Sequence, residues 1–197
     1  MRNDILVNKF RPLPRDYEPN SLVSVTSDIP KEHLDPNHKI MIVDHVLTAF
    51  NKMRNDIKKQ GFDIEIDSGY RSFEYQVNLL NQALEEKGED AYKTLAIPGT
   101  SEHQTGLAID FCITTNNIYN DDIKGDEPET IWVHAHAPIY GFILRLPKDK
   151  VDITGFNYEP WHLRYVGSEL ACYLTTYNLT LEEYHQEKTL LTRAPHS

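Results

Sequence analysis

The sequence predicts an α+β domain in which a small antiparallel sheet is flanked by helices. Apolar residues recur every three or four positions in the longer segments and alternate with polar residues in shorter ones. The predicted strands and helices are segregated along the chain, which argues against a parallel sheet built from alternating strands and helices. The 197 residues are enough for one domain with a sizeable core. We therefore expect a single domain over residues 1–197.

The N-terminal segment, residues 1–38, is rich in Pro, Asn and Asp. These residues favour turns over helices, so we expect an extended segment that packs on the domain. After it, the spacing of apolar residues predicts a helix from Ile40 to Gln60, which Gly61 ends. The later segments with helical character cover residues 73–87, 130–140, 167–177 and 181–188.

Shorter segments have the pattern of strands, and the polar stretch 116–127 is expected to be a surface loop. In one of these strands, Gly106, Ala108 and Asp110 face one way, and larger apolar residues face the other. The small neighbours of Asp110 leave room for a metal ion and its ligands on that face of the sheet. The strand-like and extended segments cover residues 62–67, 106–111, 142–146 and 158–163.

Composition and charge limit the partners of the protein. The formal net charge is −10, whereas nucleic acids and anionic membranes attract basic surfaces. No segment approaches the ~18 consecutive apolar residues of a membrane span, and the N-terminus lacks the apolar core of a signal peptide. We therefore expect a cytoplasmic protein with no nucleic-acid or membrane partner. The sequence leaves both a monomer and a homodimer open. Cys112 and Cys172 lie far apart and are expected to be free thiols in or near the core.

Two short segments hold the residues with the clearest chemical character. Ser101–Asp110 has the pattern Ser-x-His-x-x-Gly-x-Ala-x-Asp, and Glu159–His162 reads Glu-Pro-Trp-His. His103, Asp110 and His162 supply two imidazoles and one carboxylate, a full set of protein ligands for a catalytic zinc ion. Three protein ligands leave one coordination position open for water, as a hydrolase requires. The sequence therefore predicts a Zn²⁺ site formed by these three side chains.

Two further residues are candidates for catalysis. Glu159 is not needed as a ligand and is the natural base for the attacking water, although a surface carboxylate beside a proline is the alternative. Arg71 follows a predicted strand and precedes a predicted helix. A fixed guanidinium there would stabilise the negative charge that develops on a carbonyl oxygen during amide hydrolysis. Pairing of Arg71 with a surface acid is equally compatible with the local sequence.

His134 and His136 form a second pair of histidines within one predicted helix. Residues two positions apart on a helix point in different directions, so these imidazoles cannot easily share one metal ion. We interpret them as surface histidines or as outer partners of the site.

The blocks that carry these residues resemble the VanY-type D-alanyl-D-alanine carboxypeptidases, zinc peptidases of the peptidoglycan pathway. The similar region runs from about Ser68 to Gly167 and includes Tyr140–Pro147 and Ile153–Gly167. By this resemblance, zinc binds to the predicted set of two histidines and one aspartate. The resemblance also implies that Glu159 is the general base and that the arginine after Gly69 holds the scissile carbonyl.

The same resemblance extends to the substrate. Gln76 and Ser101 match positions that contact the substrate peptide or its terminal carboxylate in similar enzymes. Because the chain shows no anchor, it is most similar to the cytoplasmic bifunctional VanXY enzymes, which combine dipeptidase and carboxypeptidase activity. The implied function is hydrolysis of D-Ala-D-Ala and removal of the terminal D-Ala from the UDP-linked muramyl pentapeptide, which confers vancomycin resistance. The alternatives are an L,D-carboxypeptidase, a phage-type peptidoglycan endopeptidase, or a zinc-stabilised wall-binding module without turnover.

Overall fold

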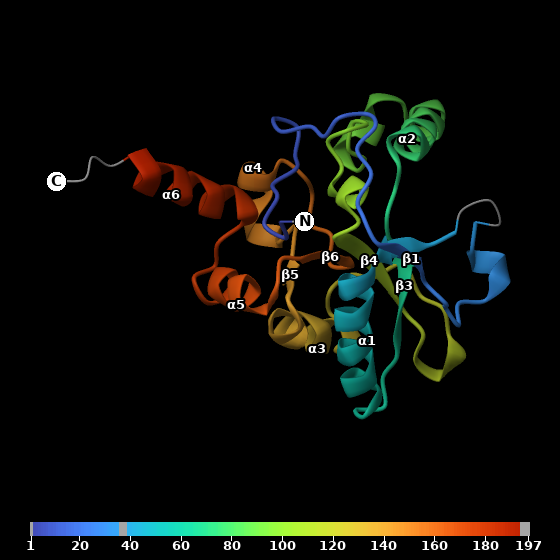
Figure 1. The fold of residues 1–197 in the computed structure, drawn as a ribbon. Helices are drawn as coiled ribbons and strands as arrows, with labels where there is room; N and C mark the ends of the chain where they lie inside the picture. The colour runs from blue at the N-terminus through green and yellow to red at the C-terminus, as the bar shows by residue number, and fades with distance from the viewer. Residues whose placement is uncertain (1, 36–38, 194–197) are drawn as a thin grey trace.

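A four-stranded antiparallel sheet lies at the centre of the computed structural model, which describes residues 2–35 and 39–193 (Figure 1). The strand order is β3-β4-β6-β5, so sequence neighbours are not always neighbours in the sheet. This arrangement, together with the helices around it, confirms the predicted α+β class. The strands of the sheet are β3 (Ile64–Ser68), β4 (Ala108–Ile113), β5 (Phe142–Leu144) and β6 (His162–Tyr165).

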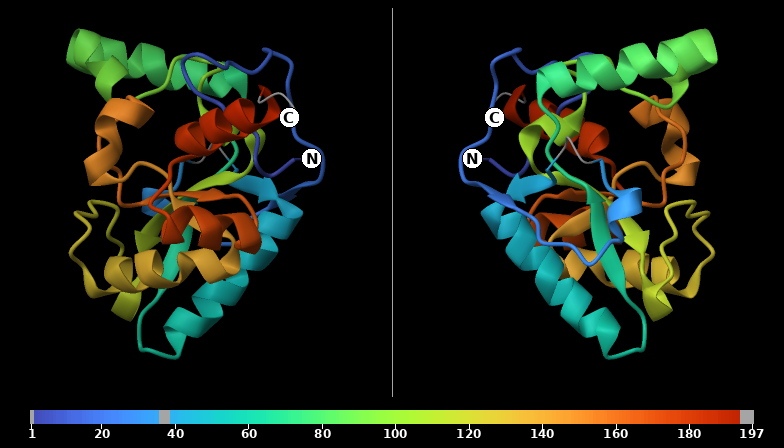
Figure 2. Two further views of the ribbon diagram at one scale, coloured as in Figure 1. Left: turned by 90° about the vertical axis from the view of Figure 1, so that its left-hand side faces the viewer. Right: turned by 90° about the vertical axis from the view of Figure 1, so that its right-hand side faces the viewer.

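The core lies between the sheet and helix α1, which directs Phe50, Met53 and Ile57 inward. Each of these side chains is at most 1% exposed, and full burial of such a side chain contributes about 1.5–3 kcal/mol. Helix α2 lies on the other side of the molecule from α1 in both side views (Figure 2). The helices are α1 (Asp44–Lys58), α2 (Phe73–Lys87), α3 (Pro128–His136), α4 (Val151–Thr154), α5 (Ser168–Thr176) and α6 (Leu181–Arg193).

The first helix begins later than its apolar spacing predicted. It starts at Asp44, because the preceding residues form strand β2 (Met41–Val43). This strand pairs with β1 (Leu22–Ser24), so the N-terminal segment contributes a strand of its own. The expectation of a helix from Ile40 was therefore wrong at its start, since backbone pairing with a distant segment overrode local spacing.

The other elements lie near their predicted positions, with shifted ends. The α-helix predicted to reach Tyr140 ends at His136 and continues as a 3₁₀ helix, in which Pro138 has no N–H to donate. Leu107, just before β4, and Ile109 and Phe111 within it point into the core, as expected from their alternation. Cys112 is buried and Cys172 is partly buried, and both are free thiols. In the described part of the chain, no helix has the length and apolar character to cross a membrane.

Candidate metal centre and active site

The three predicted metal ligands come together on one face of the sheet. Asp110 lies in β4 directly opposite His162, the first residue of β6, so strand pairing alone brings these two side chains together. His103 lies in a short 3₁₀ helix, Glu102–Thr105, that leads into β4. This helix ends at Gly106, whose φ of +65° is a left-handed conformation that glycine adopts without strain. The local turn and the sheet therefore bring the three ligands to one point.

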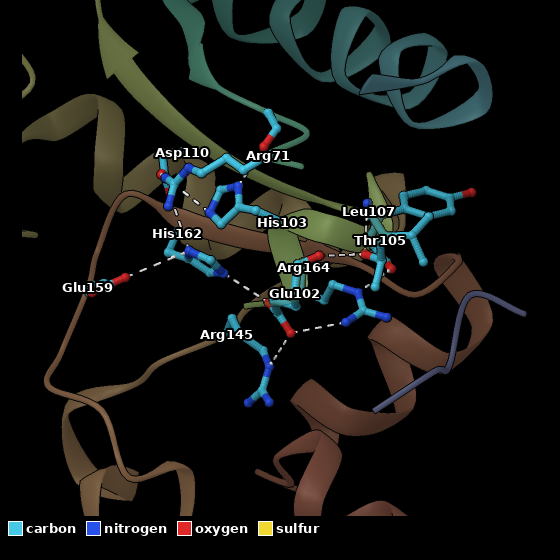
Figure 3. A network of polar contacts seen from close by, with 12 residues as sticks. Arg71, Glu102, His103, Thr105, Leu107, Asp110, Arg145, Glu159, His162 and Arg164 are labelled. Carbon is cyan, nitrogen blue, oxygen red and sulfur yellow. Dashed lines mark hydrogen bonds and ion pairs between the residues drawn. The ribbon is translucent and has the colours of Figure 1, made fainter. Parts of the chain in front are cut away.

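The distances fit a metal site. One donor atom from each of His103, Asp110 and His162 lies within 4.8 Å of the other two. His103 Nε2 is 3.3 Å from Asp110 Oδ2, and His162 Nδ1 is 3.0 Å from Asp110 Oδ1 (Figure 3). The imidazole rings are edge to face, with centroids 4.9 Å apart. Both histidines are almost fully buried, and Asp110 is partly accessible.

The other nitrogen of each imidazole has a partner that orients the ring. His103 Nδ1 is 2.7 Å from the carbonyl oxygen of Gly69, and His162 Nε2 is 2.9 Å from Glu102 Oε1. With a metal ion bound, these contacts would keep the proton on the outer nitrogen, so that the inner nitrogen serves as the metal donor. Gly69 has a packing role as well, because a Cβ there would lie 2.3 Å from the carbonyl oxygen of Met41.

Glu159 faces the same group from the segment before β6. Its Oε2 lies 3.6 Å from His162 Nδ1, the nitrogen that faces the metal position. Burial, with a smaller effect of the nearby carboxylate of Asp110, outweighs the opposing effect of His162 and raises the pKa of Glu159 to about 7. A carboxyl group with a pKa near neutrality is suited to accept and return a proton.

Arg71 extends from the turn after β3 to the metal position. Its Nε donates to Ser68 Oγ at 3.0 Å, and its Nη2 is 2.5 Å from Asp110 Oδ2. The arginine is therefore held by a site residue and not by an acid of the outer surface, the alternative that the sequence left open. Burial opposes the charge of Asp110, but His103 and Arg71 outweigh it and hold the pKa of Asp110 well below its usual range.

A cavity of about 470 Å³ opens next to these residues. Ser101, Arg71 and Glu159 line it together with the three candidate ligands. Gln76 is not among the lining residues: it is 1% exposed on α2, and its Nε2 donates to the carbonyl oxygen of Ala96 at 2.9 Å. Ala96 itself lines the cavity, so Gln76 supports its wall. Direct contact of Gln76 or Ser101 with substrate stays a prediction.

The second pair of histidines lies outside the metal group. His134 Nε2 is 2.8 Å from the carbonyl oxygen of Pro160, the residue after Glu159. His136 stacks on Trp132 with ring centroids 4.2 Å apart. His134 is thus an outer partner of the segment that carries Glu159, and His136 packs along its own helix.

Three charged residues next to the site were not identified from the sequence. Glu102, Arg145 and Arg164 are each at most 7% exposed, and the two arginines donate to one oxygen of the glutamate. A signal existed, because both arginines interrupt apolar strand segments, and a charge buried there must be paired. The sequence did not reveal which acid would be the partner.

The donor set and the electrostatics both fit a divalent cation. Burial lowers the pKa of His162, but hydrogen bonds to Asp110 and Glu102 raise it to about 10. The site therefore favours positive charge at the point where the donors converge. Two imidazoles and one carboxylate are a known ligand set of zinc, and they leave one coordination position open.

The comparison with known families agrees with this geometry. The family model described as VanY, D-alanyl-D-alanine carboxypeptidase, matches residues 39–168, which include all three candidate ligands and Glu159. The chain belongs to the VanY family.

Two curated proteins illustrate this membership. The chain is 40% identical over 183 residues to YodJ of Bacillus subtilis. This match covers 92% of this chain and 66% of YodJ. It is 35% identical over 187 residues to VanXYC of Enterococcus gallinarum, a bifunctional D-Ala-D-Ala dipeptidase and carboxypeptidase. That match covers 91% of this chain and 92% of VanXYC.

Solved structures of similar peptidases have the same fold. The LdcB LD-carboxypeptidase superposes with a TM-score of 0.78 and 41% identity, covering 92% of this chain and 84% of LdcB. A VanY D,D-pentapeptidase variant in complex with Zn(II) superposes with a TM-score of 0.76 and 29% identity. This match covers 92% of this chain and 98% of the VanY chain. Zinc is thus the cofactor of this VanY-family site, with His103, Asp110 and His162 as its ligands.

Proposed function

We propose that this protein is a zinc D,D-peptidase that removes the terminal D-Ala from peptidoglycan pentapeptide precursors and hydrolyses D-Ala-D-Ala. The observation that carries this proposal is the position of Glu159, whose carboxylate faces the converging ligands from the wall of the cavity. The family match and the likeness to VanXYC support this class of substrate. A wall-binding module without turnover would have no use for a buried carboxyl group with a pKa near 7.

The residues of the site have separate roles in this reaction. Zinc, when bound, supplies a Lewis acid that polarises water and the substrate carbonyl. Glu159 accepts a proton from the attacking water and delivers it to the nitrogen of the departing D-Ala. Arg71 stabilises the negative charge on the carbonyl oxygen, because its guanidinium is held 2.5 Å from Asp110 beside the same position. Ser101 lines the cavity and is the proposed contact for the terminal carboxylate, with Gln76 behind the wall.

The size of the cavity is compatible with removal of a terminal residue from a short peptide. Its volume of about 470 Å³ lies within the range of pockets that enclose most of a small ligand. A phage-type endopeptidase would require a groove long enough for chain on both sides of the scissile bond.

A second candidate substrate is a tetrapeptide whose terminal D-Ala follows an L-configured centre. The 41% identity to LdcB, an LD-carboxypeptidase, supports this alternative. Both reactions would release D-Ala through the same zinc and base, and they differ in the residue before the scissile bond, which is D-Ala in the pentapeptide and an L-configured residue in the tetrapeptide.

The test is chromatographic measurement of free D-Ala released from D-Ala-D-Ala, a pentapeptide and a tetrapeptide, each with and without a zinc chelator. The proposal expects release from the pentapeptide and from D-Ala-D-Ala, loss of release with chelator, and recovery when zinc is restored. Release from the tetrapeptide alone would favour the second candidate. No release from any peptide by the zinc-loaded protein would favour a binding module.

We also propose that the enzyme acts in the cytoplasm on the UDP-linked precursor and thereby confers vancomycin resistance. Removal of the D-Ala-D-Ala end would deprive the drug of its target. Expression in a susceptible host should raise the inhibitory concentration of vancomycin, whereas a Glu159→Gln variant should not. Cell fractionation of the native host would test the compartment.

A further inference from the structure

A buried network of charges links the zinc ligand His162 to the C-terminal helix. His162 Nε2 is 2.9 Å from Glu102 Oε1, on the side of the ring away from the metal position (Figure 3). The other oxygen, Glu102 Oε2, accepts from Arg145 Nε at 2.9 Å and from Arg164 Nη1 at 3.0 Å. Both oxygens of this carboxylate are therefore engaged, and its orientation is determined from three directions.

Arg145 continues the network to helix α6. Its two terminal nitrogens donate to the carboxylate of Glu182 at 2.9 and 2.6 Å, and its side chain is only 4% exposed. A guanidinium held by two acids in a fork geometry has little freedom to rotate. The position of Glu182 on α6 thus determines where Arg145 lies, and Arg145 in turn determines where Glu102 lies.

Arg164 connects the network to the N-terminal segment. It is completely buried, and its Nη2 donates to the carbonyl oxygens of Asn3 at 3.1 Å and Ile5 at 2.7 Å. Segments near both ends of the chain therefore meet at one carboxylate, 2.9 Å from a metal ligand.

We propose that Glu102 is a positioning residue for the zinc ligand His162 and that Glu182, acting through Arg145, sets the affinity of the site for zinc. A carboxylate that accepts the outer N–H of a ligating imidazole fixes the ring and increases the donor strength of its other nitrogen. The loss of such outer partners typically weakens metal binding by about 10–100-fold. This inference rests on zinc binding at the site and is independent of which peptide the enzyme cleaves.

The experiment measures zinc affinity by competition with a chromophoric chelator, so it needs no substrate. The Glu102→Gln variant keeps the size of the side chain but loses its charge, and we expect its zinc dissociation constant to rise about 10–100-fold. Glu182 lies further from the zinc ligand than Glu102 and acts on it through Arg145, so we expect Glu182→Gln to raise the zinc dissociation constant by only about 10-fold. Circular dichroism of each metal-free variant establishes that it is folded.

Glu183 offers the matched control. It neighbours Glu182 in the first turn of α6, but it pairs with Lys150 and caps the helix at Thr180. A Glu183→Gln variant should therefore bind zinc like the wild type. The proposal is overturned if Glu182→Gln leaves the zinc affinity unchanged, or if Glu183→Gln weakens it equally. If Glu102→Gln fails to fold, the zinc affinities of Glu182→Gln and Glu183→Gln still test the proposal.

Such results are distinguishable from a failure of the proposed function. A chain that binds zinc with wild-type affinity in all variants but releases D-Ala would refute only the positioning network. A chain that shows the expected affinity changes but releases no D-Ala would refute only the proposed reaction.

Discussion

Two buried charge clusters in this molecule have opposite compositions. The Glu102 cluster centres on one carboxylate with three partners that are or can be cationic: Arg164, His162 and Arg145, the last of which is shared with Glu182. The Arg54 cluster, between α1 and the start of β3, has one guanidinium and three carboxylates: Asp28, Asp63 and Glu65. The first touches a zinc ligand, whereas the second joins a helix to the sheet and contacts no residue of the metal group.

This difference in composition determines how each buried glutamate ionises. Burial alone raises the pKa of a carboxyl group. Around Glu102, Arg145 and Arg164 outweigh burial and hold its pKa well below the usual range. Around Glu65, one arginine is shared with other acids, so burial prevails and the pKa of Glu65 is raised. The ratio of charges in a buried cluster, more than the presence of one ion pair, sets the direction of the shift.

The largest expected effect is a loss of activity without a loss of stability, caused by a substitution in the active site beside the Glu102 cluster. Replacing Glu159 by Gln removes the proposed base, so peptide release should fall by about 10²–10⁴-fold. Stability of the metal-free chain should not fall, because the folded protein already disfavours the ionised carboxylate, whose pKa is raised to about 7. Steady-state kinetics tests the loss of activity, and urea unfolding tests the retained stability. Zinc affinity should also be retained, and near-normal activity would contradict the role of Glu159.

The second effect should appear in stability alone. Arg54→Met leaves the buried Glu65 without its cation, and removal of one partner of such a pair should lower the free energy of unfolding by about 3 kcal/mol. Urea unfolding measures the loss, and chelator competition should show wild-type zinc affinity. Lys58→Met is the control, because Lys58 is 43% exposed and contacts only Asp63 of this cluster. Its effect should stay within about 0.5 kcal/mol, and weaker zinc binding in Arg54→Met would break the proposed separation of the two clusters.

The smallest effect sharpens the comparison through pH. A carboxyl group with a raised folded-state pKa binds more protons in the folded chain than in the unfolded chain, so its contribution to stability decreases as the pH rises. For Glu65, this decrease should begin near its ordinary value of 4.5 and end above its raised folded-state pKa. The stability of the wild type relative to Glu65→Gln should therefore decline over this window, by about 1.4 kcal/mol for each unit of the shift. Urea unfolding of both proteins from pH 4.5 to 7 tests this prediction. It would be contradicted if the stability of the wild type relative to Glu65→Gln increased with pH.

The N-terminal part of the chain shows where sequence patterns were insufficient. Ile40, Val43 and Val46 have helical spacing, yet Met41–Val43 forms a strand because β1 pairs with it. Apolar spacing describes which residues a segment can bury, but not which distant backbone will offer hydrogen bonds.

The sequence by itself determined the α+β class and the zinc ligands, and it singled out Glu159 as the proposed base. His103 and Asp110 lie within one short motif, and Glu159 and His162 lie within another, so local spacing carries this information. Only the tertiary structure decided that Glu102 would meet Arg145, Arg164 and His162. Buried charges choose their partners through the packing of segments far apart in the chain, and no local pattern records that choice.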